Sequence, residues 1–93
     1  MAEFVKVLGR DYRVERGPAP LGDSDHGRSE YFNQRIWINP DMSEQEQEST
    51  LVHEVLHCIS YMLYLELPEE HVMRLEVALY DLGFRVKTTK GKK

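Results

Sequence analysis

The sequence has few residues that could cross-link the chain or anchor it in a membrane. Its 93 residues include one cysteine, Cys58, so an internal disulfide is excluded. There is no apolar run of transmembrane length and no secretory signal, and we therefore expect a cytoplasmic protein without a membrane partner. The length also excludes a second domain, because so short a chain can bury only one modest core.

Basic residues are outnumbered as well. The chain has 12 Lys and Arg against 16 Asp and Glu, which leaves a net charge of −4 and a pI of about 5.5. This balance argues against a general nucleic-acid-binding protein. The basic stretch 87–93, KTTKGKK, is the exception, and we expect it to be a disordered tail behind a single domain over residues 1–86.

Strand patterns occupy the first half of the chain. Apolar and polar residues alternate over 3–8 and again over 11–16, which predicts a hairpin. Residues 17–27 are rich in turn formers and have no period, so they predict a loop. Two short strands over 30–32 and 35–39 are expected to follow. The pattern predicts a small antiparallel sheet of three or four strands.

Two helices are expected after the sheet. The sequence Ser43-Glu44-Gln45-Glu46 matches a capping box and predicts a helix from Ser43 to about Leu63. Pro68 suits the first position of a second helix over about 68–82, which Gly83 can end in a left-handed conformation. Strands followed by helices predict the α+β fold class.

The first predicted helix carries His53-Glu54-Val55-Leu56-His57. Residues four apart lie ~40° and ~6 Å apart on one helix face, so the two imidazoles can bind the same zinc ion. Glu54 would stand beside the open position of the metal, where it can take a proton from a bound water. The pattern predicts peptide-bond hydrolysis, and the competing interpretation is a pair of core histidines with other hydrogen-bond partners.

A tetrahedral catalytic zinc ion needs a third protein ligand. The chain offers carboxylates and histidines at Glu66, Glu69, Glu70, His71, Glu76, Asp81, Asp23, Asp25 and His26. A symmetric hairpin of the two helices would bring Glu76 level with His57, whereas a steep crossing would favour Glu69. Spacing alone does not decide between these arrangements. Cys58 is not expected to be a ligand, because one residue beyond His57 is a rotation of ~100° around the helix.

The segments 36–46 and 50–57 resemble the small phage and prophage zinc metallopeptidase-like proteins related to the ImmA/IrrE group. The resemblance extends over roughly residues 3–83. It implies that a Glu of the helix after the motif is the third ligand, and Glu69 matches that position. It also implies an acidic or amide residue four positions further on, which orients a ligand histidine. This chain has Met73 there instead.

Because a thioether is a poor acceptor for an imidazole N–H, the orienting partner must come from elsewhere. The candidates are a backbone carbonyl, Ser60 and Glu76. The residue that stabilises the oxyanion is equally open, with Tyr61, His71 and Tyr80 as the candidates.

We therefore expect a zinc-dependent metallopeptidase in which His53, His57 and Glu69 bind zinc and Glu54 acts as general base on the zinc-bound water. The expected partner is a peptide or protein substrate, bound along Arg35–Asn39 as an exposed edge strand. Two other interpretations stay open at this point.

The first alternative is a structural zinc module, whose closed four-ligand site would be completed by His71 or His26. The second is a degenerate peptidase fold that serves as a zinc-stabilised protein-binding or regulatory module. Neither alternative requires a carboxylate at Glu54, whereas hydrolysis does.

Overall fold

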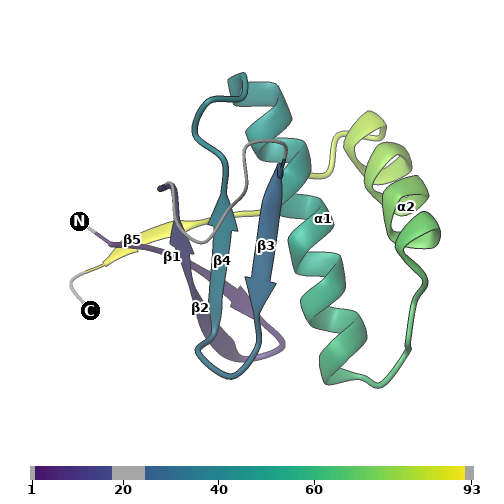
Figure 1. The fold of residues 1–93 in the computed structure, drawn as a ribbon, viewed down its shortest axis with the longest axis horizontal. Helices are drawn as coiled ribbons and strands as arrows, with labels where there is room; N and C mark the ends of the chain where they lie inside the picture. The colour runs from purple at the N-terminus through teal and green to yellow at the C-terminus, as the bar shows by residue number, and fades with distance from the viewer. Residues whose placement is uncertain (1, 18–24, 92–93) are drawn as a thin grey trace.

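The computed structural model describes residues 2–17 and 25–91. Within them, five strands and two helices follow one another along the chain (Figure 1): β1 (Ala2–Val7), β2 (Arg10–Glu15), β3 (Gly27–Glu30), β4 (Arg35–Ile38), α1 (Glu44–Met62), α2 (Glu69–Asp81) and β5 (Thr89–Gly91). The fold is α+β, as the sequence predicts.

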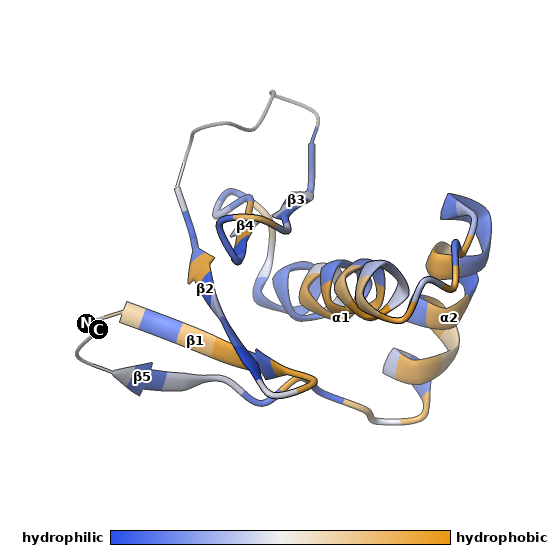
Figure 2. Ribbon diagram, turned by 90° about the horizontal axis from the view of Figure 1, so that it is seen from below, coloured by the Kyte–Doolittle hydropathy of each residue, from blue (hydrophilic) through white to orange (hydrophobic). Residues whose placement is uncertain are grey.

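The strands form one sheet in the order β3-β4-β2-β1-β5. Helix α1 lies between this sheet and α2, so the molecule has three layers (Figures 1 and 2). Neither helix of the described segments combines the length and the apolar composition that crossing a membrane requires.

The sheet differs from the expected one in two respects. It has a fifth strand, and β2 pairs with β4 in parallel, whereas the other neighbours are antiparallel. Alternation of apolar residues identifies a strand and its buried face, but it does not encode the direction of the neighbouring strand. The parallel pair arises because the chain passes from β2 to the outer strand β3 before it returns through β4.

The prediction that residues 87–93 form a disordered tail is also partly wrong. Thr89–Gly91 pairs with β1 as β5, with Phe4 opposite Thr89 and Ala2 opposite Gly91. The backbone of this segment is therefore held by ladder hydrogen bonds, which do not depend on the apolar pattern that the tail lacks. Lys92 and Lys93 lie outside the described residues.

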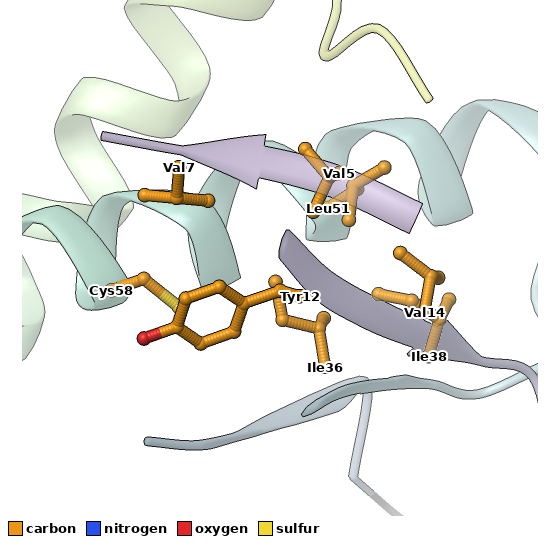
Figure 3. Close-up of a cluster of buried hydrophobic side chains, with 8 residues drawn as sticks. All are labelled: Val5, Val7, Tyr12, Val14, Ile36, Ile38, Leu51 and Cys58. Atoms are coloured by element: carbon orange, nitrogen blue, oxygen red, sulfur yellow. The ribbon is translucent and has the colours of Figure 1, made fainter. Parts of the chain in front are cut away.

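The core lies between the sheet and α1 (Figure 3). Inward-facing residues of three strands pack against α1, and the buried cluster consists of Val5, Val7, Tyr12, Val14, Ile36, Ile38, Leu51 and Cys58. Cys58 is 0% exposed, and burial raises the pKa of its thiol to about 11. The expectation that Cys58 is a core residue and not a ligand agrees with this position.

Strand β4 is not an edge of the sheet, contrary to the prediction for Arg35–Asn39. It is paired on one side with β2 and on the other with β3. Its backbone groups are therefore occupied, and a peptide cannot add to it. The edge strand on this side is β3, Gly27–Glu30, whereas the sequence pattern ends the loop at Gly27 and begins the strand only at Glu30.

Both helices begin and end close to the predicted positions. The Ser43 hydroxyl accepts a hydrogen bond from the Glu46 backbone N–H at 3.2 Å, which caps α1. Gly83 has φ +95° directly after α2, a conformation that favours glycine. These local signals do not depend on the rest of the fold, which is why the sequence predicts them well.

Candidate metal centre

Helix α1 presents His53 and His57 on the face that is turned toward α2. Their Nε2 atoms lie 3.2 Å apart, and the two rings meet at 63° with centroids 4.8 Å apart. The four-residue spacing places both rings on one side of the helix, as predicted. Two ring nitrogens this close, aimed at the same point, leave room for a shared cation between them and the next helix.

Glu69 completes the group from the first residue of α2. Its Oε1 lies 2.9 Å from Nε2 of both His53 and His57, and one donor atom from each of the three residues falls within 4.8 Å of the others. Burial opposes ionisation of Glu69, but the hydrogen bonds and charges of the two histidines outweigh it and lower its pKa. The crossing of the helices thus selects Glu69 among the alternatives that the sequence left open.

The other candidate ligands lie outside this group. Of the described residues, the candidates that are exposed and are not members of the group are Glu66, Glu70, His71 and Asp81, together with Asp25 in the loop before β3. His26 lines the neighbouring cavity without joining the group, and Asp23 lies outside the described residues.

The donor set fits a zinc ion. Two imidazoles and one carboxylate are the protein ligands of many catalytic zinc sites. Ligand atoms of a tetrahedral ion with bonds of ~2.1 Å lie roughly 3.4 Å apart. The three observed separations, 3.2 Å between the imidazoles and 2.9 Å from each imidazole to Glu69, need only small adjustments to reach that value.

Glu76 supports the centre from behind. It accepts a hydrogen bond from Nδ1 of His53 at 2.8 Å, and the Ser49 hydroxyl donates to its other carboxylate oxygen. Burial opposes protonation of His53, but the bond to Glu76 and the charge of Glu69 outweigh it and raise its pKa. Glu76 therefore fills the orienting role for which Met73 is unsuited, one turn further along α2.

Glu54 lies beside the group and is 6% exposed. The Ser29 hydroxyl donates to its Oε1 at 2.7 Å. Burial raises the pKa of Glu54, and the Ser29 hydrogen bond and the two histidines reduce this rise without cancelling it. Ser29 is not among the site residues predicted from the sequence, because the pattern places the strand at 30–32, whereas β3 is Gly27–Glu30. The alternation of β3 itself, with Gly27 and Ser29 facing α1, is the signal that could have identified it.

A cavity of about 470 Å³ opens in front of these residues. It is lined by the candidate centre and by parts of β3, α1 and α2, namely His26, Gly27, Ser29, Tyr31, Thr50, His53, Glu54, His57, Glu69, Met73 and Glu76.

None of the three residues considered for oxyanion stabilisation lines this cavity. Tyr61 stacks on Tyr31, His71 is exposed, and the Tyr80 hydroxyl donates to Glu48 at 3.0 Å. The phenol that does line the cavity is Tyr31, in the turn after β3. Burial raises the pKa of Tyr31, and the negative charges of Glu54 and Glu69 raise it further, which keeps the phenol protonated.

Comparison with known proteins connects this geometry to a family. A family model, Peptidase M78, the IrrE N-terminal-like domain, matches residues 6–60. The match runs from the last two residues of β1 through most of α1 and includes His53, Glu54 and His57, but it ends before Glu69. No curated protein and no solved structure matches the chain. Because the family model covers more than half of the sequence, the chain belongs to the Peptidase M78 family of IrrE N-terminal-like domains.

Proposed function

We propose that this protein is a zinc-dependent peptidase. The observation that carries the proposal is the convergence of His53, His57 and Glu69 within 4.8 Å at the wall of a cavity, next to the buried carboxylate of Glu54. Membership of a metallopeptidase-like family supports the same conclusion. When bound by these three residues, a zinc ion supplies Lewis acidity, which polarises a carbonyl and makes water more acidic.

Glu54 is the proposed general base. Its raised pKa makes the carboxylate a stronger proton acceptor than an exposed glutamate, and its surroundings shield it from bulk water. The hydrogen bond from Ser29 holds one carboxylate oxygen, so the other stays free to receive a proton from the attacking water. The proton then passes from Glu54 to the nitrogen of the leaving amine.

The substrate is proposed to bind along β3. This strand forms an edge of the sheet, and Gly27 and Ser29 line the cavity in front of Glu54. An extended peptide can pair with such an edge through main-chain hydrogen bonds, which brings one of its peptide bonds to the centre. In this arrangement β3 is the edge strand that pairs with the substrate, a role that was predicted from the sequence for Arg35–Asn39.

The donor count favours an open centre over a closed structural one. The metal-ligating group in the described part of the chain has three members, and neither His26 nor His71 joins it. A structural zinc site would use a fourth protein ligand, whereas a catalytic site leaves that position to water or substrate. The three-residue group therefore supports catalysis.

The proposal is tested with Glu54→Gln. The amide keeps the size and the hydrogen-bonding capacity of the side chain but cannot act as a base. Zinc content should stay at the wild-type level, while hydrolysis of peptides found by screening a proteome-derived library should fall by about 10²–10⁴-fold. The exposed Glu70→Gln on α2 is the matched control and should cleave normally. Equal cleavage by Glu54→Gln, or no cut by zinc-loaded wild type, would overturn the mechanism.

A further inference from the structure

A second pocket adjoins the candidate metal centre. It has a volume of about 330 Å³ and is lined by residues of the β3–β4 turn, of α1 and of the segment that leads to α2, namely Tyr31, His57, Ser60, Tyr61, Tyr64, Glu66 and Leu67. Tyr31 and His57 also line the cavity of the centre. The two hollows therefore share the wall formed by Tyr31 and His57, so a side chain of a ligand held at the centre has the second pocket next to it.

Two stacked rings build one wall of the pocket. Tyr31 comes from the turn after β3 and Tyr61 from the last turn of α1, and their rings are nearly parallel at 7° with centroids 4.1 Å apart. Stacking across two elements fixes both ring planes. This wall therefore stays in place when a ligand enters.

The opposite side is formed by the connection between α1 and α2. Ser60 holds this segment, because its hydroxyl accepts from the Leu67 backbone N–H at 2.9 Å and its carbonyl accepts from the Leu65 N–H at 2.9 Å. Tyr64 and Glu66 adopt φ values of 55° and 53°, which residues other than glycine seldom do. Strain of this kind is kept only where surrounding contacts impose it, and it is frequent at ligand sites.

The chemistry of the pocket is mostly apolar. Three aromatic rings and Leu67 face it, and Tyr64 is 88% exposed in the free protein, so its ring is available to a ligand. The acidic groups around it are Glu66, which lines the pocket, and Glu54, Glu69 and Glu76, which line the adjoining cavity together with His26 and His53. An acidic side chain would be repelled there, whereas an aromatic or leucine side chain would be covered on two sides.

We propose that this pocket is a specificity subsite, which receives an apolar side chain, aromatic or leucine-sized, of the residue next to the scissile bond. The inference rests on the proposed peptidase function and adds the substrate class to it: peptides with a large apolar residue at the cleavage position. A glycine or alanine at that position leaves the pocket empty and forfeits the contact.

Affinities of acetylated amino-acid hydroxamates for the zinc-loaded protein test the subsite without requiring catalysis. The hydroxamate chelates the metal, while phenylalanine, lysine, aspartate and glycine side chains probe the pocket. We expect the phenylalanine compound to bind tightest, on the order of 10–100-fold tighter than the aspartate and glycine compounds. Calorimetric titration measures each affinity, and zinc content and circular dichroism verify each protein.

Two variants and a control locate the effect. Tyr64→Asn removes the ring at a position where asparagine tolerates the positive φ, and it should reduce the preference for phenylalanine about ten-fold. Leu67→Lys adds a cation and should shift the preference toward aspartate. Phe32→Ala is the matched control, because Phe32 is 96% exposed in the same turn as Tyr31 and does not line the pocket.

Equal affinities for all side chains, the tightest binding by the lysine compound, or a preference unchanged in both variants would overturn the subsite. These results would leave the proposed peptidase function standing. That function is tested separately, by peptide cleavage in the wild type and its loss in Glu54→Gln. Zinc-loaded protein that binds no hydroxamate and cleaves no peptide would overturn the proposed function, and the inference with it.

Discussion

Nδ1 of His53 donates to Glu76 at 2.8 Å and thereby ties the motif helix to α2 behind the candidate metal centre. The bond leaves Nε2 of His53 free to face Glu69. A carboxylate on the far nitrogen also makes the imidazole a better donor to a metal, because it stabilises the positive charge that the ring shares with the ion. Glu76 is thus a positioning residue for the centre.

The first prediction concerns this pair. Glu76→Ala should weaken zinc binding by about 10–100-fold, because the His53 ring loses both its orientation and its charge partner. Competition with a chelator of known zinc affinity measures the change. Glu70→Ala, which removes an exposed carboxylate from the same helix, should bind zinc like wild type. Equal affinities for the two variants would mean that Glu76 has no role at the centre.

The second prediction concerns the coupling of metal and stability. We expect about one zinc ion per chain, bound only by the folded protein because the three ligands come from two helices. Free zinc at 100 times the dissociation constant should then raise the free energy of unfolding by about 2.7 kcal/mol. Thermal unfolding with and without a chelator measures the effect, and His57→Ala should abolish it. If the melting temperature of the wild type were the same with and without zinc, the proposed metal centre would be excluded.

The third prediction is a pH dependence of the metal-free protein. The folded-state pKa of Glu54 is raised by burial, so the folded chain binds this proton more tightly than the unfolded chain does. Stability is therefore lost as the pH rises from the unfolded pKa through the folded pKa. At neutral pH the free energy of unfolding of Glu54→Gln should exceed that of wild type by about 1 kcal/mol. Below pH ~4 this difference should vanish.

Denaturant unfolding in the presence of a chelator at several pH values measures this difference. Ser29 can still donate its hydroxyl proton to the amide oxygen of the variant, so the comparison isolates the buried charge. A Glu54→Gln variant that is less stable than wild type at pH 7 would show that the carboxylate is well solvated.

The fourth prediction concerns the close contact of β3 with α1. A Cβ at Gly27 would lie 2.8 Å from the Trp37 carbonyl oxygen, 2.8 Å from Cγ2 of Thr50 and 3.2 Å from Cγ of Glu54. Gly27→Ala should therefore push the edge strand away from the helix, at a cost of about 1–3 kcal/mol.

Urea unfolding measures that cost, and hydrolysis should fall with it because β3 carries Ser29. Gly17→Ala is the matched control, since a Cβ there meets nothing within 4 Å. If both glycine variants were equally stable, β3 would not be packed against α1 as closely as the structure shows.

The sequence by itself determined the bounds of the two helices and the helix face that His53 and His57 share. The capping box at Ser43 and the left-handed position at Gly83 act within a few residues, so both helices could be placed without knowing what they pack against. The four-residue spacing of His53 and His57 fixes their common face in any α-helix, and the structure keeps it.

Only the tertiary structure decided which residues meet that face. The choice of Glu69, the bond from Glu76 to His53 and the hydroxyl of Ser29 on Glu54 depend on how α2 crosses α1 and on the register of β3. Contacts between residues 12 to 25 positions apart are set by the packing of whole elements, which single-residue preferences do not encode.

The strand order was likewise decided by the tertiary structure. A strand pattern states which side chains are buried but not which neighbour a strand takes, so Arg35–Ile38 reads the same as an edge or as an interior strand. Thr89–Gly91 has no apolar pattern and joins the sheet through backbone hydrogen bonds to β1. Backbone groups are alike in every residue, and only the completed sheet shows where their partners lie.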